Sequence, residues 1–266
     1  MVKFVSGNGQ LVTYGLPVNR QAERVTLIFF CRIVGMLNPR TMREVSFPVE
    51  RHELSGRVFD CAGGGAARRG ILFVHGQGSS QESYKQRAEI ASATLGAICL
   101  TFNLTRHGEA DANSEKYLVV KHLNDVIAAF DYLASDPLLD RQRIGVCGAS
   151  YGGYLATLLT LHRNIRRLIL RAPSLAVDHN LLKPPSADPD AQYEFDSLKA
   201  LAGYTGETLI IQSERDEVIP ESHIDAYLRA NPRAGKKVIP EAMHALTNPA
   251  WDKLFVQYIV DWFRDM

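Results

Sequence analysis

The stretch Gly148-Ala149-Ser150-Tyr151-Gly152-Gly153 decides how this chain folds. An apolar run, Ile144–Cys147, precedes it and another, Tyr154–Leu159, follows it, so a strand should lead into the stretch and a helix out of it. A serine on so sharp a turn has a strained backbone, and side chains two residues before and after it would collide. The start of the helix adds free N–H groups and the positive end of its dipole. The pattern therefore predicts that Ser150 is an exposed nucleophile suited to attack an acyl carbon.

From about residue 44 onward, apolar runs of strand length alternate with segments of helix length. The expected strands are residues 45–50, 56–60, 71–74, 97–102, 143–147, 168–170, 208–211 and 238–239. The first two should form a pair around a turn at Glu53–Gly56. The expected helices are residues 81–95, 119–134, 154–161, 197–202 and 251–263. This alternation predicts an α/β fold, with a mostly parallel central sheet and helices on both of its faces.

The pattern predicts one large domain over residues 42–266, preceded by an N-terminal extension over residues 1–41. Residues 173–207 interrupt the alternation with a proline-rich segment that we interpret as a short lid over the carboxyl edge of the sheet. The extension contains the apolar run Val25–Leu37, which is shorter than the roughly 20 residues that cross a bilayer. Its internal Arg32 is atypical of a secretory signal. Three interpretations stay open: an element packed on the domain, a surface anchor, or sequence upstream of a natural start at Met42.

Composition excludes several classes of function. The 266 residues are 46% apolar and 22% charged, with a formal net charge of +1, which argues against a nucleic-acid-binding protein and against a disordered chain. The four cysteines are scattered without a C-x-x-C pair, and no H-E-x-x-H motif is present. We therefore expect no metal, no cofactor, no disulfide framework and no stable membrane insertion, and a cytoplasmic location. The sequence indicates no particular oligomeric state.

A serine nucleophile needs a base, and the base needs an acid that orients it. Asp216 follows the strand expected at residues 208–211, in a loop that also holds Glu214 and Glu217. His244 follows the last expected strand, and we favour it because no other histidine that we considered occupies such a place. Those histidines are His75, His107, His122, His162, His179 and His223, of which His122 and His162 fall in helical segments and are interpreted as structural.

Residues 44–266 resemble the α/β-hydrolase superfamily. The segment Asp216–Pro220 matches the acidic loop D-x-V-[VI]-P of that family, and His244–Leu246 matches its late H-x-L. The S-Y-G-G form of the serine turn is similar to that of the prolyl-oligopeptidase-like and dienelactone-hydrolase-like branches. The resemblance implies Ser150 as nucleophile, His244 as base and later acid, and Asp216 as the residue that fixes the imidazole.

The same reaction needs two backbone N–H groups that bind the oxyanion of the tetrahedral intermediate. One is expected from Tyr151, the residue after the nucleophile. The other is expected in the loop after the strand that ends at His75, and the resemblance implies Gln77, which follows the His-Gly pair.

These residues predict a serine hydrolase that cleaves a carboxylic ester of a small acyl substrate through an acyl-enzyme intermediate. A peptidase, a thioesterase or an acyltransferase could use the same residues. A hydrolase-fold protein that binds a ligand without turnover is the alternative outside enzymes. Specificity should come from the lid at residues 173–207 and from the loop Thr105–Lys116.

Overall fold

The computed structural model describes residues 2–5, 11–14, 42–60, 67–105, 118–175 and 195–266. The chain divides into two compact units, Met1–Asn38 and Pro39–Met266. In the first unit, strands β1 (Val2–Val5) and β2 (Leu11–Tyr14) form an antiparallel pair that the sequence pattern did not predict. The apolar run Val25–Leu37 lies outside the described residues.

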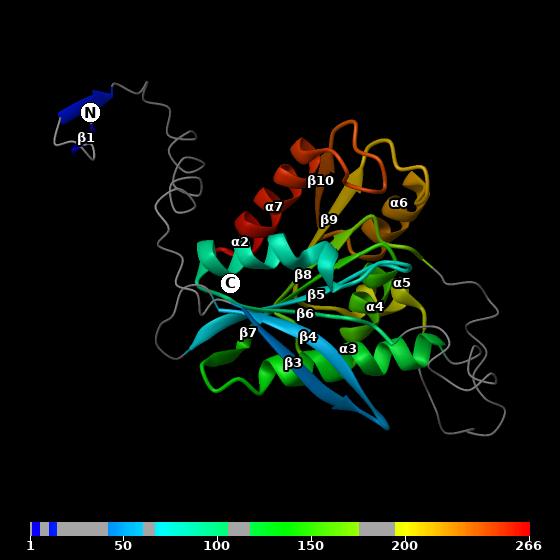
Figure 1. The fold of residues 1–266 in the computed structure, drawn as a ribbon. Helices are drawn as coiled ribbons and strands as arrows, with labels where there is room; N and C mark the ends of the chain where they lie inside the picture. Colours follow the sequence, from blue (N-terminus) through cyan, green and yellow to red (C-terminus); the bar gives the residue numbers. More distant parts are fainter. Residues whose placement is uncertain (1, 6–10, 15–41, 61–66, 106–117, 176–194) are drawn as a thin grey trace. The chain divides into compact units, whose positions relative to one another are not determined.

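The second unit is built on one sheet, which has eight strands in the part of the chain that the structure describes (Figure 1). Its strands are β3 (Met42–Val49), β4 (His52–Phe59), β5 (Arg68–Val74), β6 (Ile98–Phe102), β7 (Leu139–Ala149), β8 (Arg167–Arg171), β9 (Glu207–Ser213) and β10 (Gly235–Ile239). Their order is β10-β9-β8-β7-β5-β6-β4-β3. The pairs β3–β4 and β4–β6 are antiparallel and all the others are parallel, so the predicted mostly parallel sheet is confirmed.

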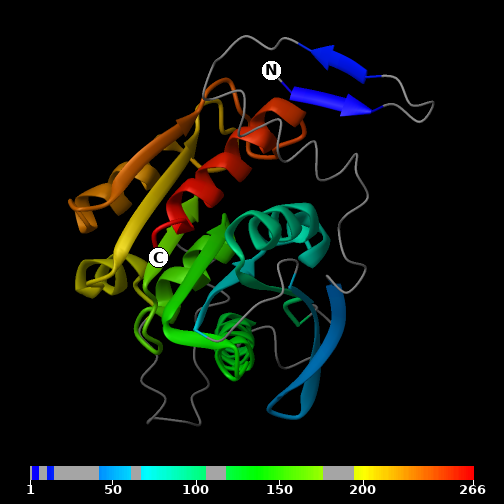
Figure 2. The ribbon, with the colours of Figure 1, turned by 90° about the vertical axis from the view of Figure 1, so that its left-hand side faces the viewer.

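Helices cover both faces of this sheet, as predicted (Figures 1 and 2). One face packs against α2 (Lys85–Leu95) and α7 (Pro249–Phe263), and a short 3₁₀ turn, η1 (Gln81–Tyr84), leads into α2. The other face packs against α3 (Leu118–Ala134), α4 (Tyr151–Leu159), α5 (Ser197–Gly203) and α6 (Glu221–Ala230).

Strand β5 shows why the apolar runs had to become central strands. Ile71 and Phe73 contribute to the core under α2 and α7, while Leu72 and Val74 contribute to the core on the opposite face. All four side chains are buried. Because successive side chains of a strand point to opposite faces, a strand covered on both faces needs a continuous apolar run.

The turn between β3 and β4 differs from the prediction. Val49 pairs with His52, so the connection consists of Glu50 and Arg51 rather than Glu53–Gly56. Gly56 instead lies inside β4, opposite Phe102 of β6. A Cβ atom at Gly56 would lie only 2.9 Å from the carbonyl oxygen of Thr101, so this glycine permits a close approach of two strands and does not make a turn.

The segment predicted as a lid is described only at its ends, because residues 176–194 lie outside the described residues. The helix predicted at residues 197–202 is confirmed as α5, and Asp196 caps it by accepting hydrogen bonds from the N–H groups of Leu198 and Lys199.

Helix α6 was not predicted. Ile224 and Tyr227 are its buried residues, and Leu228 packs partly against the same core. This spacing of three and four residues is the signal that could have found the helix.

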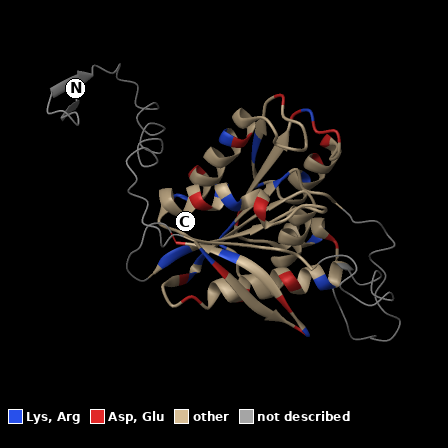
Figure 3. Cartoon of the chain, viewed as in Figure 1, with Lys and Arg blue, Asp and Glu red and all other residues tan. Residues whose placement is uncertain are grey.

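Charged residues of both signs are interspersed along the helices in the view of Figure 3. Within the described residues, no helix is both long and apolar enough to cross a membrane. Cys99 of β6 and Cys147 of β7 are buried in the core.

The close approach at Gly56 gives a testable stability difference. We expect Gly56→Ala to lower the free energy of unfolding by about 1–3 kcal/mol, because the added Cβ meets a backbone oxygen that cannot move away easily. Urea denaturation measures the difference. Gly203→Ala is the matched control, since a Cβ there meets nothing within 4 Å. Equal stability of the two variants would contradict the steric account of Gly56.

Candidate active site

Ser150 lies between β7 and α4 in a strained backbone conformation, with φ 54° and ψ −123°. Hydrogen bonds hold this conformation from both sides of the residue. Its N–H donates to the carbonyl oxygen of Arg171 at 2.9 Å, and its own carbonyl accepts from the N–H groups of Gly153 at 3.0 Å and Ser174 at 3.2 Å. The turn predicted from the sequence is therefore present, and it places Ser150 at the carboxyl end of a central strand.

The glycines around Ser150 are required by contacts within the backbone. A Cβ atom at Gly148 would lie 2.3 Å from the carbonyl oxygen of Gly152. A Cβ atom at Gly152 would lie 2.3 Å from the carbonyl oxygen of Val74 and 2.5 Å from that of His75. The steric reason predicted for both glycines is confirmed, and it also shows how tightly the turn packs on the end of β5.

Backbone strain is concentrated at this edge of the sheet. Of the five non-glycine residues with positive φ in the described part of the chain, Ser150, Ala172 and Glu241 follow the ends of β7, β8 and β10. Their φ values are 54°, 42° and 60°. Strained residues of this kind persist only where the surroundings fix them, and they are typical of active sites.

Asp216 and His244 are brought together at the same edge. Nδ1 of His244 lies 3.0 and 2.9 Å from the two carboxylate oxygens of Asp216. Since a carboxylate can only accept, this contact assigns the ring proton to Nδ1 and leaves Nε2 as an acceptor. Burial opposes the ionisation of Asp216, but hydrogen bonds from His244 and from the N–H groups of Ile219 and Val218 outweigh it and lower the pKa of its carboxyl below the ordinary value.

The two other acids of this loop hold the backbone rather than the imidazole. Glu217 accepts a hydrogen bond from the N–H of His244 at 3.0 Å, and Glu214 accepts one from the N–H of Glu241 at 2.8 Å. Of the three candidate acids, Asp216 is thus the one whose carboxylate contacts the ring of His244.

Ser150 and His244 are connected through a residue that the sequence reasoning missed. Arg171, at the end of β8, accepts from the N–H of Ser150 and donates from its guanidinium to the carbonyl of His244 at 2.9 Å. Within the described residues, no hydrogen bond joins Oγ of Ser150 to the ring of His244 directly. Nothing in the local sequence around Arg171 could have indicated a contact with a residue so distant along the chain.

The loop after β5 lies beside Ser150. A Cβ atom at Gly76 would be 3.2 Å from Cβ and 3.8 Å from Oγ of Ser150. The N–H of Ser79 donates to the carbonyl of Gly76 at 3.2 Å, which closes a turn with Gln77 and Gly78 at its centre and Gly78 at a φ of 69°. Gln77 is exposed.

The N–H groups expected to bind an oxyanion are both free to do so. Tyr151 is the first residue of α4, where a helix leaves its N–H without an intrahelical acceptor. Neither this N–H nor that of Gln77 has an acceptor among the described residues. The contact between Gly76 and Ser150 places the turn that carries Gln77 next to the start of α4.

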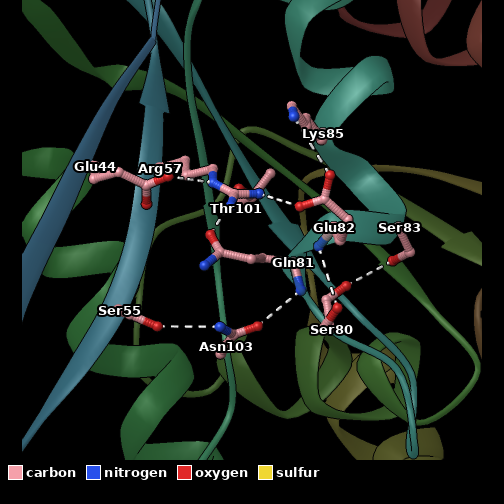
Figure 4. Close-up of polar contacts among 10 residues, drawn as sticks. All are labelled: Glu44, Ser55, Arg57, Ser80, Gln81, Glu82, Ser83, Lys85, Thr101 and Asn103. Carbon is pink, nitrogen blue, oxygen red and sulfur yellow. Dashed lines mark hydrogen bonds and ion pairs between the residues drawn. The ribbon is translucent and has the colours of Figure 1, made fainter.

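The far end of the same loop is anchored to β4 and β6 (Figure 4). Asn103 accepts from the N–H of Gln81 at 2.9 Å and donates to Oγ of Ser55 at 3.0 Å, while Thr101 donates to the side chain of Gln81 at 3.3 Å. Arg57 pairs with Glu82 in the first turn after the loop. These contacts fix where the loop ends and η1 begins.

Two other histidines, His75 and His122, form hydrogen bonds with residues next to Ser150 and in the loop after β5. Nε2 of His75 accepts from the N–H of Leu104 at 3.1 Å, and its Nδ1 lies 2.8 Å from the carbonyl of Gly76. Burial lowers the pKa of His75, which favours the neutral ring. His122 lies 3.0 Å from the hydroxyl of Tyr151, so a residue interpreted as structural contacts a site residue directly.

No group of three or more His, Cys, Asp or Glu side chains in the described parts of the chain is arranged to hold a metal ion. The loop Thr105–Lys116, expected to contribute to specificity, lies outside the described residues except for Thr105.

With this geometry in view, the chain can be compared with known proteins. The alpha/beta hydrolase family matches residues 71–265, and the chain belongs to this family. A protein of Mycobacterium tuberculosis (strain ATCC 25618 / H37Rv) named "Putative phosphoribosyl transferase" is 26% identical over 201 residues, which are 73% of this chain and 40% of that protein. The chain thus spans about two fifths of the length of this relative.

Solved structures show the same fold at low sequence identity. The esterase of Pyrobaculum calidifontis superposes with a TM-score of 0.67 at 15% identity, over 94% of this chain and 94% of that chain. The acylaminoacyl peptidase of Pyrococcus horikoshii superposes with a TM-score of 0.65 at 18% identity, over 85% of this chain and 42% of that chain.

The lowered pKa of Asp216 predicts how stability depends on pH. Asp216→Asn should lower the free energy of unfolding at pH 7 by about 1–3 kcal/mol, because a buried carboxylate with three donors loses its charge. Since the folded-state pKa is below the unfolded value, this stabilisation is complete above the ordinary pKa of 3.8 and is lost as the pH falls through the folded-state pKa.

Denaturant unfolding of the wild type and the variant between pH 7 and pH 3 measures this difference. Glu217→Gln is the control from the same loop, since it keeps an oxygen that can accept from His244. A stability difference for Asp216→Asn that did not change across this pH range would contradict the assignment.

Proposed function

We propose that the protein is a serine hydrolase that cleaves a carboxylic ester through an acyl-enzyme intermediate. Oγ of Ser150 attacks the acyl carbon and its proton passes to Nε2 of His244, while Asp216 holds the proton on Nδ1. The N–H groups of Gln77 and Tyr151 bind the negative oxygen of the tetrahedral intermediate. The carbon–oxygen bond to the alcohol then breaks, and His244 gives its proton to the leaving oxygen.

Water completes the cycle by attacking the acyl carbon of the ester on Ser150. It loses a proton to His244, the bond between the acyl carbon and Oγ breaks, and the proton returns to Oγ. The carboxylic acid is released and the starting state of Ser150 and His244 is restored. No step needs an oxidant, a reductant or a second substrate besides water.

The observation that carries the proposal is that one sheet edge holds a strained serine, an oriented imidazole and two N–H groups that have no acceptor within the described residues. The pair formed by Asp216 and His244 supports the role of His244 as the base, since Nε2 is left as an acceptor. Hydrogen bonds between nucleophile and base are often long in the absence of substrate and tighten in the complex. The missing direct bond between Ser150 and His244 is consistent with that behaviour.

Ester hydrolysis is preferred over the other acyl transfers for one reason. The match to the Pyrobaculum calidifontis esterase extends over 94% of both chains, whereas the match to the acylaminoacyl peptidase covers 42% of that chain. A thioester would use the same residues, so thioesterase activity is the alternative to be measured beside ester hydrolysis.

The test is labelling by a fluorophosphonate probe combined with hydrolysis of p-nitrophenyl esters of increasing acyl length. We expect the wild type to be labelled, and we expect Ser150→Ala to lose labelling and at least about 10⁴-fold in kcat, because the nucleophile is absent. Ser135→Ala is the matched control, since this exposed serine hydrogen-bonds within its own turn at the end of α3.

Three results would contradict the proposal. A wild-type protein that neither reacts with the probe nor hydrolyses any ester would favour the ligand-binding alternative. Full esterase activity in Ser150→Ala would show that another residue is the nucleophile. Greater activity on the matching thioester than on the ester would replace the ester by the thioester as substrate class.

A further inference from the structure

The end of β8 carries a buried arginine that the reaction steps above do not use. The side chain of Arg171 lies in the interior beside an apolar core, and the residue is 7% exposed. Among the described residues, its guanidinium makes hydrogen bonds to two neutral oxygens rather than to a carboxylate. On the basis of the proposed function, we propose that Arg171 is a positioning residue that fixes the base His244 relative to the nucleophile Ser150.

The backbone of Arg171 holds the nucleophile. Arg171 pairs with Ala149 of β7 on one side and with Ile211 of β9 on the other. It is the last residue of β8 to pair with both neighbouring strands. Its carbonyl accepts the hydrogen bond from Ser150 at 2.9 Å. The next residue, Ala172, has a φ of 42° and donates to the carbonyl of Ile211 at 2.8 Å, which ends the strand at a fixed place.

The side chain of Arg171 holds the base. One nitrogen of the guanidinium donates to the carbonyl of His244 at 2.9 Å and to Oγ of Ser213 at 3.3 Å. The N–H of His244 is bound by Glu217 and its ring by Asp216. Three residues therefore bind His244, namely Glu217, Asp216 and Arg171. Of these three, Arg171 is the one whose own carbonyl also binds the N–H of Ser150.

A role in packing alone does not account for this residue. Burying a cation without a paired anion is unfavourable, and an apolar side chain of similar volume would fill the same space at lower cost. Burial accordingly lowers the pKa of Arg171. The ring of Phe255 in α7 lies 5.9 Å from the centre of the guanidinium and offsets part of this cost. What an apolar replacement could not supply is the donor to the carbonyl of His244.

The test compares Arg171→Met, Arg171→Lys and the wild type in hydrolysis of a short p-nitrophenyl ester, with kcat and KM measured for each. We expect Arg171→Met to lose about 10- to 100-fold in kcat with KM changed less than about 3-fold, because the base is displaced from the nucleophile. Arg171→Lys should recover part of kcat, since it keeps a charged N–H donor for the carbonyl of His244.

Arg167→Met is the matched control. Arg167 begins the same strand, its side chain is also largely buried, and it donates to the carbonyl of Trp262 in α7 at 2.6 Å. This variant should lose stability but keep the kcat and KM of the wild type. If Arg171→Met does not fold, Arg171→Gln replaces it, with the same expected loss of kcat.

The outcomes separate the inference from the function on which it rests. If the wild type hydrolyses the ester through Ser150 but a folded neutral variant of Arg171 behaves like Arg167→Met, the inference is overturned and the proposed function stands. If Arg171→Lys recovers none of the kcat that Arg171→Met loses, the role of the donor to the carbonyl of His244 is overturned. If the wild type shows no hydrolysis that depends on Ser150, the proposed function and the inference about Arg171 are both overturned.

Discussion

The site depends on one strained backbone conformation, the positive φ of Ser150 at the junction of β7 and α4. This conformation turns the chain so sharply that Gly148 and Gly152 approach each other's backbone, and Gly152 also approaches the carbonyl oxygens at the end of β5. Any side chain at either glycine would push these segments apart. The strain is therefore maintained by close packing of backbone against backbone, and that packing fixes where the serine hydroxyl is presented.

Because β7 lies between β5 and β8, the same turn determines what surrounds the serine. The loop after β5 contacts Ser150 through Gly76 and carries Gln77, while the end of β8 supplies the carbonyl that accepts from the N–H of Ser150. The loops after β9 and β10 carry Asp216 and His244. In a parallel sheet the carboxyl ends of all these strands lie at one edge. The strand order alone therefore brings residues that are far apart in the sequence close together there.

The sequence allowed the central part of this arrangement to be predicted because its causes are local. A strand covered on both faces needs a continuous apolar run, as in Ile71–Val74, and the serine turn needs glycines at fixed spacing. The pairing of Asp216 with His244 was expected from their order after successive strands, and the structure brings them into contact. The catalytic roles of these residues, like the cytoplasmic location and the extent of the N-terminal extension, stay predictions.

What could not be predicted has causes that are distant in the sequence. Gly56 was interpreted as a turn residue, but its role depends on the approach of β6, which no local pattern records. Helix α6 was missed although Ile224, Tyr227 and Leu228 recur at helical spacing, so its signal was present in the sequence. Arg171 is an ordinary charged residue at the end of a strand until β10 places the carbonyl of His244 beside its guanidinium. Contacts between a side chain and a remote backbone group leave no signal in a single sequence.

The central claim is that an acyl group is transferred to Oγ of Ser150. The most direct measurement is mass spectrometry of the protein quenched during turnover of an ester whose acyl-enzyme is hydrolysed slowly, followed by mapping of the modified peptide. We expect a mass increase equal to the acyl group, located on the peptide that contains Ser150 and absent from Ser150→Ala. An acyl group on another residue, or turnover of the ester without any covalent intermediate, would contradict it.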